Sequence, residues 1–168
     1  MRYYKAVLFG SIGTIVETSE IQRRSFNKAF KLCGLNWIWT KNIYKKLLSK
    51  SGGKNRVLRY AKKENFKVDS IKISNLKTRI FNNYLKKKQL KLRPGIKNLI
   101  KKCKKEKIKL AFVTSTSTSN INSIFFSLKK SISKKDFQFI GNKNLVKKLK
   151  PNPDIYLLAL KKLNLDAK

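Results

Sequence analysis

The sequence predicts an α/β protein in which a helical segment is inserted after the first strand of a small parallel sheet. Three short apolar runs have the length and composition of buried strands: residues 5–9, 108–113 and 137–140. Helical patterns separate these runs, and strands that are joined through helices form parallel sheets with right-handed crossovers. The run 15–92 holds helical patterns and no convincing strand. We therefore expect an α/β core made of residues 1–14 and 93–168, with a helical cap at 15–92.

The predicted cap opens with an amphipathic helix at 18–33, for which Thr18 or Ser19 is an N-cap candidate. The apolar face of this helix consists of Ile21, Phe26, Ala29, Phe30 and Cys33. The helical pattern resumes at 43–48 and stops at the Gly52-Gly53 pair.

Two more amphipathic helices, at 57–61 and 71–85, complete the predicted cap, and Asp69 or Ser70 suits the N-cap of the second. After the cap, Pro94 suits the first position of a helix that carries Ile96, Leu99, Ile100 and Cys103. The remaining helices are expected at the following ranges: 119–128 and 153–163.

Composition predicts a folded chain that works in the compartment where it is made. At 168 residues and 41% apolar content, the chain can bury one core and a small subdomain. No apolar run has the length of a membrane span, and residues 1–4 lead directly into the first strand, which leaves no room for a targeting peptide. Cys33 and Cys103 lie far apart on apolar helix faces, and the chain has no His. We interpret both cysteines as reduced core thiols.

The net charge of +34 allows two interpretations. The first is a nucleic-acid-binding protein. The second is a codon usage rich in A and T, which places Lys, Asn and Ile at every tolerant surface position. The second is favoured because the lysines are spread through all the predicted helices, because Arg is scarce, and because Trp37, Trp39 and most Phe residues fall on core faces. Either way, we expect non-specific binding to polyanions at low salt.

A motif at residues 6–18 connects the sequence to a known family. The run Ala-Val-Leu-Phe-Gly-Ser-Ile-Gly-Thr-Ile-Val-Glu-Thr resembles the first motif of haloacid dehalogenase (HAD) phosphatases, an apolar strand followed by Asp-x-Asp-Gly-Thr. In that family the first Asp attacks phosphorus and binds Mg²⁺, and the second is the general acid and base. Here Gly10 and Ile12 stand at these two positions, and neither side chain can do that chemistry. The resemblance thus implies a HAD-like parallel Rossmannoid sheet with an inserted α-helical cap, no intact catalytic residue and no Mg²⁺ cofactor.

The resemblance is most specific to the CbbY-like sugar-phosphate phosphatases of the Calvin cycle. Six more segments follow the patterns of this subgroup in the right order: 21–27, 34–39, 44–56, 90–95, 110–115 and 150–156. The resemblance implies an ancestral role in removing phosphate from sugar phosphates such as xylulose-1,5-bisphosphate. Residue usage typical of a reduced, AT-rich genome suggests a plastid stroma or a cytoplasm-like compartment.

The resemblance also implies which residues hold a phosphate group. Lys150 stands where the family's Lys neutralises the phosphate, and Thr114 with Ser115 follows a strand and precedes a helix, where hydroxyl and N–H groups can hold it. An ordinary surface Lys and an ordinary N-cap are the alternative interpretations. No metal ligand is expected.

Residues of the predicted cap match the family's substrate-selecting positions. These are Glu17, Gly52, Gly53, Lys54 and Arg56. The alternative is a surface carboxylate at 17 and a turn between helices at 52–56 flanked by solvated charge. Gln22 stands where members of the subgroup have His, which is a further departure from the family pattern.

The resemblance also raises an expectation about the edge of the sheet. The family's core continues with a fourth strand that carries acidic Mg²⁺ ligands and with a fifth strand, in the order 3-2-1-4-5. This sequence reaches Lys168 about where the fourth strand is expected to begin. We therefore expect an incomplete sheet of three strands with the first at an edge. We consider three alternatives for that edge: a partner chain covers it, the last helix folds over it, or it stays uncovered and the protein is only marginally stable.

Three functional hypotheses follow. The favoured one is a CbbY-like homologue without phosphatase activity, a pseudoenzyme that can still hold a sugar phosphate. The second is an active sugar-phosphate hydrolase whose missing parts lie on another chain. The third is a basic protein that binds nucleic acid or another polyanion on a HAD scaffold.

Overall fold

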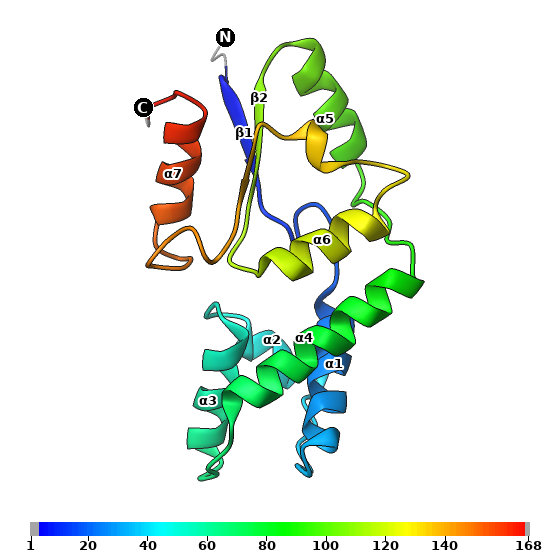
Figure 1. Ribbon diagram of the computed structural model, residues 1–168, viewed down its shortest axis with the longest axis vertical. Coiled ribbons are helices and arrows are strands. Elements are labelled where there is room, and N and C mark those ends of the chain that lie inside the picture. The colour runs from blue at the N-terminus through cyan, green and yellow to red at the C-terminus, as the bar shows by residue number, and fades with distance from the viewer. Residues whose placement is uncertain (1–3, 167–168) are drawn as a thin grey trace.

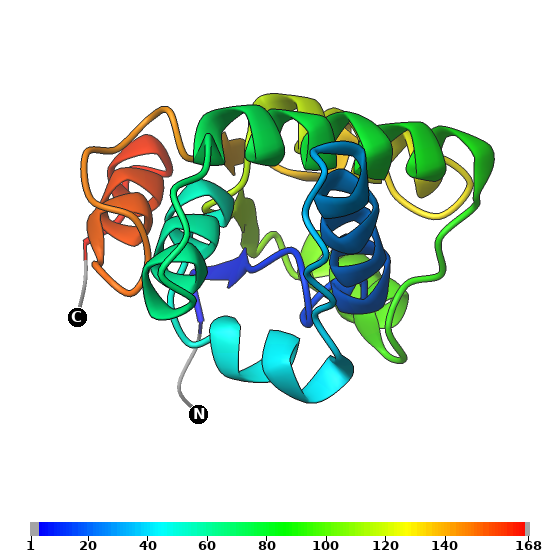
Figure 2. The ribbon, with the colours of Figure 1, turned by 90° about the horizontal axis from the view of Figure 1, so that it is seen from below.

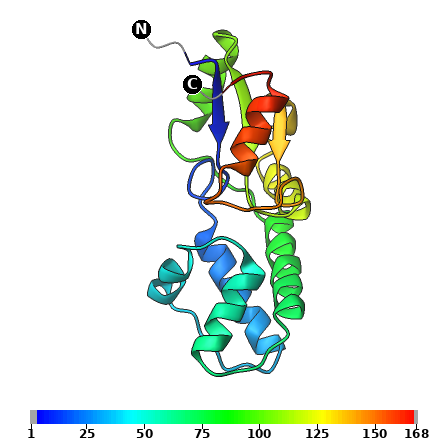
Figure 3. The ribbon, with the colours of Figure 1, turned by 90° about the vertical axis from the view of Figure 1, so that its left-hand side faces the viewer.

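The computed structural model describes residues 4–166, which form a sheet-bearing core and a helical cap (Figure 1). The elements follow in the order β1 (Ala6–Phe9), α1 (Ser19–Leu32), α2 (Lys41–Leu47), α3 (Gly53–Lys63), α4 (Ser70–Lys87), α5 (Ile96–Lys105), β2 (Lys109–Val113), α6 (Thr118–Ser127), the 3-10 helix η1 (Lys134–Asp136), β3 (Phe139–Gly141) and α7 (Asp154–Lys162). Figure 3 shows the core above the cap, with two chain segments joining them.

The sheet has three parallel strands in the order β1-β2-β3, which confirms the predicted sheet. Leu8 pairs with Ala111, and Phe112 pairs with Ile140. Because β1 pairs with β2 alone among the described residues, it lies at an edge of this sheet. The partner chain predicted at that edge stays a prediction.

Helices cover both faces of the sheet, so β2 is apolar along almost its whole length. Leu110 and Phe112 point into a core cluster shared with α5 and α6. The alternate residues, Ala111 and Val113, pack against α7. This alternation is the period of two that a strand imposes on its side chains.

The cap is organised around a fully buried indole. Trp39 lies 4.7–4.8 Å, centroid to centroid, from the rings of Phe26 and Phe30 in α1, and stacks on Tyr44 of α2 at 6.0 Å. The amide of Asn27 fixes the backbone of Trp39, since it accepts from the Trp39 N–H at 3.0 Å and donates to its carbonyl at 3.1 Å. The predicted apolar face of the first helix is confirmed at Phe26, Ala29 and Phe30, all fully buried.

Helix α4 packs in both parts of the molecule. Its residue Ile73 belongs to the cap cluster, whereas Phe81 and Leu85 belong to the core cluster around β2. Seen from below, α4 runs past the other cap helices and on beside α6 (Figure 2). The boundary between cap and core therefore crosses packed side chains, and the predicted limits at 15 and 92 stay predictions.

Several predicted element boundaries are wrong by a few residues. Pro94 precedes its helix, because Gly95 at φ 82° is the N-cap and α5 starts at Ile96. Helix α3 starts at Gly53, four residues before the predicted range, since Gly52 at φ 92° forms its N-cap. Phe137 closes the turn of η1 by donating to the Lys134 carbonyl, so β3 begins only at Phe139.

The predicted caps and cysteines have mixed outcomes. Asp69 caps α4, as predicted, by accepting from two backbone N–H groups. Thr18 occupies the N-cap of α1 without a side-chain cap bond; the Glu17 carboxylate accepts from the Ser19 N–H at 2.7 Å instead. Cys33 and Cys103 are free. Within residues 4–166, no helix is both long and apolar enough to span a membrane.

Candidate functional site

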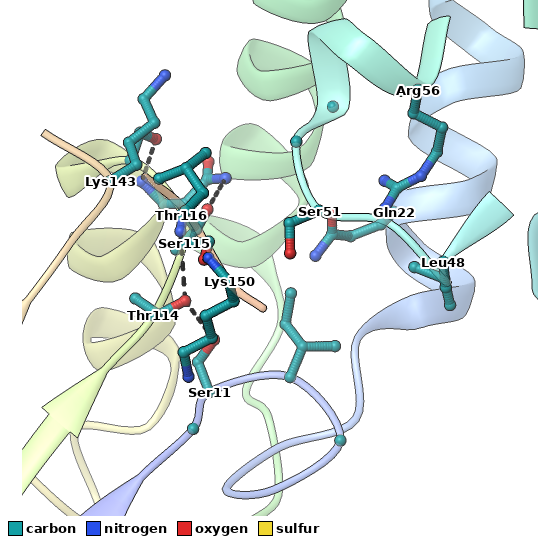
Figure 4. Close-up of a pocket in the computed structure, with 18 of the residues that line it drawn as sticks. Ser11, Gln22, Leu48, Ser51, Arg56, Thr114, Ser115, Thr116, Lys143 and Lys150 are labelled. Atoms are coloured by element: carbon teal, nitrogen blue, oxygen red, sulfur yellow. Dashed lines mark hydrogen bonds between the residues drawn. The ribbon is translucent and has the colours of Figure 1, made fainter. Parts of the chain in front are cut away.

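A pocket of about 870 Å³ lies between the carboxyl ends of β1 and β2 and the cap. The loop after β1 and the loop after β2 form its core side, while the α2–α3 loop and the inner faces of α1 and α4 form its cap side. Figure 4 shows Ser11, Thr114 and Lys150 on the core side, opposite Ser51 and Gln22. Carboxyl ends of parallel strands are the usual ligand-binding edge of α/β proteins.

The loop after β1 is a tight turn that presents backbone and a hydroxyl to the pocket. The carbonyl of Ser11 accepts from the N–H groups of Ile15 and Val16 at 2.9 and 3.2 Å, and Gly13 takes φ 77°. The Ser11 hydroxyl, which is buried, lies 3.1 Å from the Thr114 hydroxyl. That bond joins the loops of the two strands on the core side of the pocket.

The loop after β2 supplies a row of hydroxyl groups. The Thr114 hydroxyl accepts from the Thr116 N–H at 3.3 Å, and the Ser115 hydroxyl accepts from the Lys150 N–H at 3.3 Å. Ser117 caps α6, which starts at the edge of the pocket. The predicted phosphate residues Thr114, Ser115 and Lys150 are thus brought together in one place.

The Lys150 ammonium is anchored at the end of β2. It donates to the Val113 carbonyl at 3.1 Å and lies 4.4 Å from the centroid of the Tyr156 ring. Neither partner is an anion, so no carboxylate among these contacts competes with a ligand for the ammonium. Its position next to the hydroxyl row is what anion binding requires.

On the cap side, Gly52, Gly53 and Lys54 line the pocket, and their predicted contact with a substrate stays a prediction. Arg56 also lines it, but its guanidinium is already engaged: it donates to the Leu47 carbonyl at 2.9 Å and to the Lys50 carbonyl at 3.3 Å. Burial lowers the pKa of Arg56. Its contacts show that it fixes the shape of the α2–α3 loop.

Glu17 does not line the pocket. One of its carboxylate oxygens accepts from the Ser19 N–H, and the other lies 3.8 Å from an Arg93 nitrogen. It therefore stabilises the start of α1, and its predicted contact with the substrate stays a prediction.

Lys77 on α4, a buried lysine that lines the pocket, was not predicted from the sequence. Its side chain is 5% exposed, its ammonium donates to the Gln22 amide oxygen at 2.5 Å, and it lies 5.0 and 4.8 Å from the rings of Phe26 and Phe81. Burial lowers the pKa of Lys77 to about 7, and the nearby charge of Arg56 adds to that effect. No carboxylate contacts it within the described residues.

The pocket is cationic throughout. Lys54, Arg56, Lys77, Lys143 and Lys150 line it, and among the described residues neither Asp nor Glu does. A Cβ built on Gly10 would lie 3.0 Å from the Thr14 hydroxyl, closer than ordinary van der Waals contact, so a side chain at this position requires Thr14 to shift. Mg²⁺ takes carboxylate and other oxygen ligands, so the residues present do not fit that ion. They do fit an anionic ligand with hydroxyl groups.

Comparisons with known proteins agree with this geometry. The family model described as haloacid dehalogenase-like hydrolase matches residues 7–168. Protein CbbY of Cereibacter sphaeroides is 34% identical over 163 residues, which cover 95% of this chain and 71% of that protein. The CBBY-like protein of Arabidopsis thaliana is 32% identical over 173 residues, covering 96% of this chain and 54% of that protein.

Solved structures show the same similarity. A mutant of CbbY from Rhodobacter sphaeroides in complex with xylulose-(1,5)bisphosphate superimposes with a TM-score of 0.87 at 34% identity, over 97% of this chain and 74% of that chain. CbbY from the same organism in complex with phosphate gives a TM-score of 0.87 at 33% identity, over the same shares.

Proposed function

The chain belongs to the haloacid dehalogenase-like hydrolase family and has CbbY as a homologue, and on that premise we propose that it binds a phosphorylated sugar without hydrolysing it. The observation that carries this proposal is the pocket lining, which combines five cationic side chains and a row of hydroxyls with no carboxylate among the described residues. The cationic side chains and hydroxyls support binding. Gly10 and Ile12 provide neither the nucleophile nor the general acid of the family's reaction, and among the described residues no carboxylate lines the pocket to hold Mg²⁺.

The ligand we propose is xylulose-1,5-bisphosphate or a sugar phosphate of similar size. The CbbY structures with this bisphosphate and with phosphate support it, because 97% of this chain superimposes on each of them. One phosphate would lie against Lys150 and the hydroxyls of Thr114 and Ser115. Charge-assisted hydrogen bonds from fixed donors are the strong contacts of such a site.

The residue usage of the chain supports a plastid or another compartment with an AT-rich, reduced genome. Lysine, which has A-rich codons, far outnumbers arginine in the chain. Detection of its peptides in purified plastids would test this placement.

Calorimetric titration with xylulose-1,5-bisphosphate, in EDTA and again in Mg²⁺, tests binding directly. We expect saturable binding in both, because no pocket residue recruits the metal. Lys150→Gln should weaken binding about 10- to 100-fold, since a hydrogen bond from a charged group is worth about 1.5–3 kcal/mol. Lys148→Gln is the matched control, because Lys148 is exposed on the same loop and does not line the pocket.

Phosphate release in the same samples tests the second half of the proposal. We expect none above the buffer background, with or without Mg²⁺. Mg²⁺-dependent release that copurifies with the chain and disappears in Lys150→Gln would overturn the assignment as a binding protein. It would favour the hydrolase hypothesis instead.

A further inference from the structure

Two lysine-rich segments that lie far apart in the sequence meet on the surface. These are residues 84–91, at the end of α4, and residues 126–130, at the end of α6. The Leu90 N–H donates to the Ser127 carbonyl at 3.1 Å, and the Ser127 hydroxyl donates to the Lys88 carbonyl. Figure 1 shows α6 lying along this end of α4. We call residues 84–91 and 126–130 the basic–aromatic surface.

The charge of this surface is positive and unbalanced. Its six lysines are all exposed: Lys86, Lys87, Lys88, Lys91, Lys129 and Lys130. Neither segment contains an acidic residue, and none of these lysines belongs to an ion pair in the part of the chain that the structure describes. Folding thus brings the like charges of two segments onto one part of the surface, which costs free energy that a polyanion would recover.

Two aromatic rings lie among the lysines. Tyr84 is 42% exposed and Phe126 is 50% exposed, although large aromatic rings are usually well buried. The Lys88 ammonium is 5.6 Å from the centroid of the Tyr84 ring, and the Lys129 ammonium is 4.8 Å from that of Phe126. Exposed rings flanked by cations are the combination with which proteins bind unpaired bases, which stack on the rings while the cations contact phosphates.

We propose that the basic–aromatic surface binds single-stranded nucleic acid. The lysines contact the phosphates, while Tyr84 and Phe126 offer stacking faces to the bases. A double helix hides its base faces, so the rings favour a single strand. Lysine acts on phosphate as a point charge, so this surface reads no sequence. None of its residues lines the sugar-phosphate pocket, so this activity is separate from the proposed function.

Fluorescence anisotropy with a labelled single-stranded RNA of about 12 nucleotides, at about 0.1 M salt, measures this binding. The charge variant replaces four lysines with glutamine: Lys86, Lys87, Lys129 and Lys130. A matched control makes the same change at four lysines that also end helices and are also exposed: Lys62, Lys63, Lys161 and Lys162. We expect a rise in Kd of at least about tenfold for the charge variant and less than about threefold for the control, because contacts to phosphate dominate this affinity.

The aromatic variant, Tyr84→Ala with Phe126→Ala, keeps the charge and removes the stacking faces. We expect it to raise the Kd for the single strand about tenfold or more and to leave the Kd for heparin unchanged, because heparin has no base to stack. Both side chains are half exposed, so the variant should stay folded, which circular dichroism verifies.

Three outcomes overturn the proposal. If the control lysines matter as much as the four at the surface, the affinity reflects only net charge. If the aromatic variant binds the single strand as the unmodified protein does, or if a duplex binds as tightly as the single strand, there is no stacking platform.

Discussion

Replacing Lys77 with methionine should make the free protein more stable at mildly acidic pH while it weakens sugar-phosphate binding. Lys77 is buried in the cap, and one neutral amide oxygen is its hydrogen-bond partner. A buried ammonium without a carboxylate is costly. Methionine has a similar length, carries no charge and packs well against aromatic rings such as those of Phe26 and Phe81.

The magnitude follows from the pKa of Lys77, which burial lowers from 10.5 to about 7. At about 1.36 kcal/mol per pH unit, this corresponds to about 5 kcal/mol in favour of the neutral amine. The variant leaves the buried Gln22 oxygen without a donor, which costs about 1–3 kcal/mol. The expected net gain in the free energy of unfolding is therefore about 2–4 kcal/mol near pH 6.

The gain in the free energy of unfolding that Lys77→Met brings must depend on pH, because the unmodified protein no longer buries a charge once Lys77 is neutral. The pKa in the folded state is below that in the unfolded state, so the unmodified protein gains stability as pH rises from about 7 toward 10.5. Between about pH 7 and pH 9 that gain is about 2.7 kcal/mol at 1.36 kcal/mol per pH unit. The advantage of Lys77→Met should thus nearly vanish at pH 9.

Urea unfolding at about pH 6 and pH 9 measures the difference in the free energy of unfolding between the variant and the unmodified protein at each pH. Lys72→Met, on an exposed position of the same helix, is the control and should change stability little at either pH. A variant that is less stable than the unmodified protein at pH 6, or whose advantage is the same at both pH values, would refute the reasoning. It would mean that the contacts of the ammonium outweigh its burial, or that Lys77 does not titrate in this range.

Three further predictions concern the cap. Glu20→Gln should lower the melting temperature near pH 6 but not near pH 2: hydrogen bonds from Arg23 and Arg24 lower the pKa of Glu20 to about 2, so its contribution is present above the unfolded value and is lost as pH falls through the folded one. Trp39→Ala should cost about 3–5 kcal/mol in urea unfolding, since it empties the centre of the cap. Arg56→Leu should cost about 2–3 kcal/mol, and speed proteolysis of the α2–α3 loop, because two carbonyls lose their donor.

The sequence predicted the parallel sheet because its strands are short apolar runs, and burial on both faces gives such runs. The predicted start of a helix was wrong where a glycine determines it. Gly52 and Gly95 take positive φ and act as N-caps, so their helices start directly after them. Periodicity reports which face is buried, and it carries no information on where one residue switches to the left-handed region.

The sequence pointed to pocket-lining residues where the chain carries a local signal. Thr114 and Ser115 follow a strand, and Lys150 lies in a recognisable motif, and the fold brings these together. Lys77 was missed because it is one of many lysines. Yet a signal existed: Ile73, Lys77, Phe81 and Leu85 recur every four residues on α4, which places the lysine on the buried face.

The sequence also did not predict which aromatic side chains are exposed on the surface. Tyr84 and Phe126 occur within apolar patterns, and a pattern alone does not tell a core ring from an exposed one. Only packing shows that Leu85 and Phe125, the neighbours of these two residues in the sequence, fill the core. The aromatic rings of the basic–aromatic surface therefore emerge from the fold and not from the sequence.

Lys77, which destabilises the cap when no ligand is bound, also explains why a pocket lined by cations can occur in a folded protein. Lys77 shares the pocket with four other cations, and no carboxylate among the described residues lines it to balance their charge. Under the proposed function, a bound phosphate ester supplies the missing negative charge. The free energy that Lys77 costs the empty protein then becomes part of the binding free energy, because a ligand that binds only the folded state stabilises it. Under the proposed function, the absence of carboxylates at positions 10 and 12 accounts for the expected lack of catalysis and, by the same electrostatics, for the expected affinity for a phosphate ester.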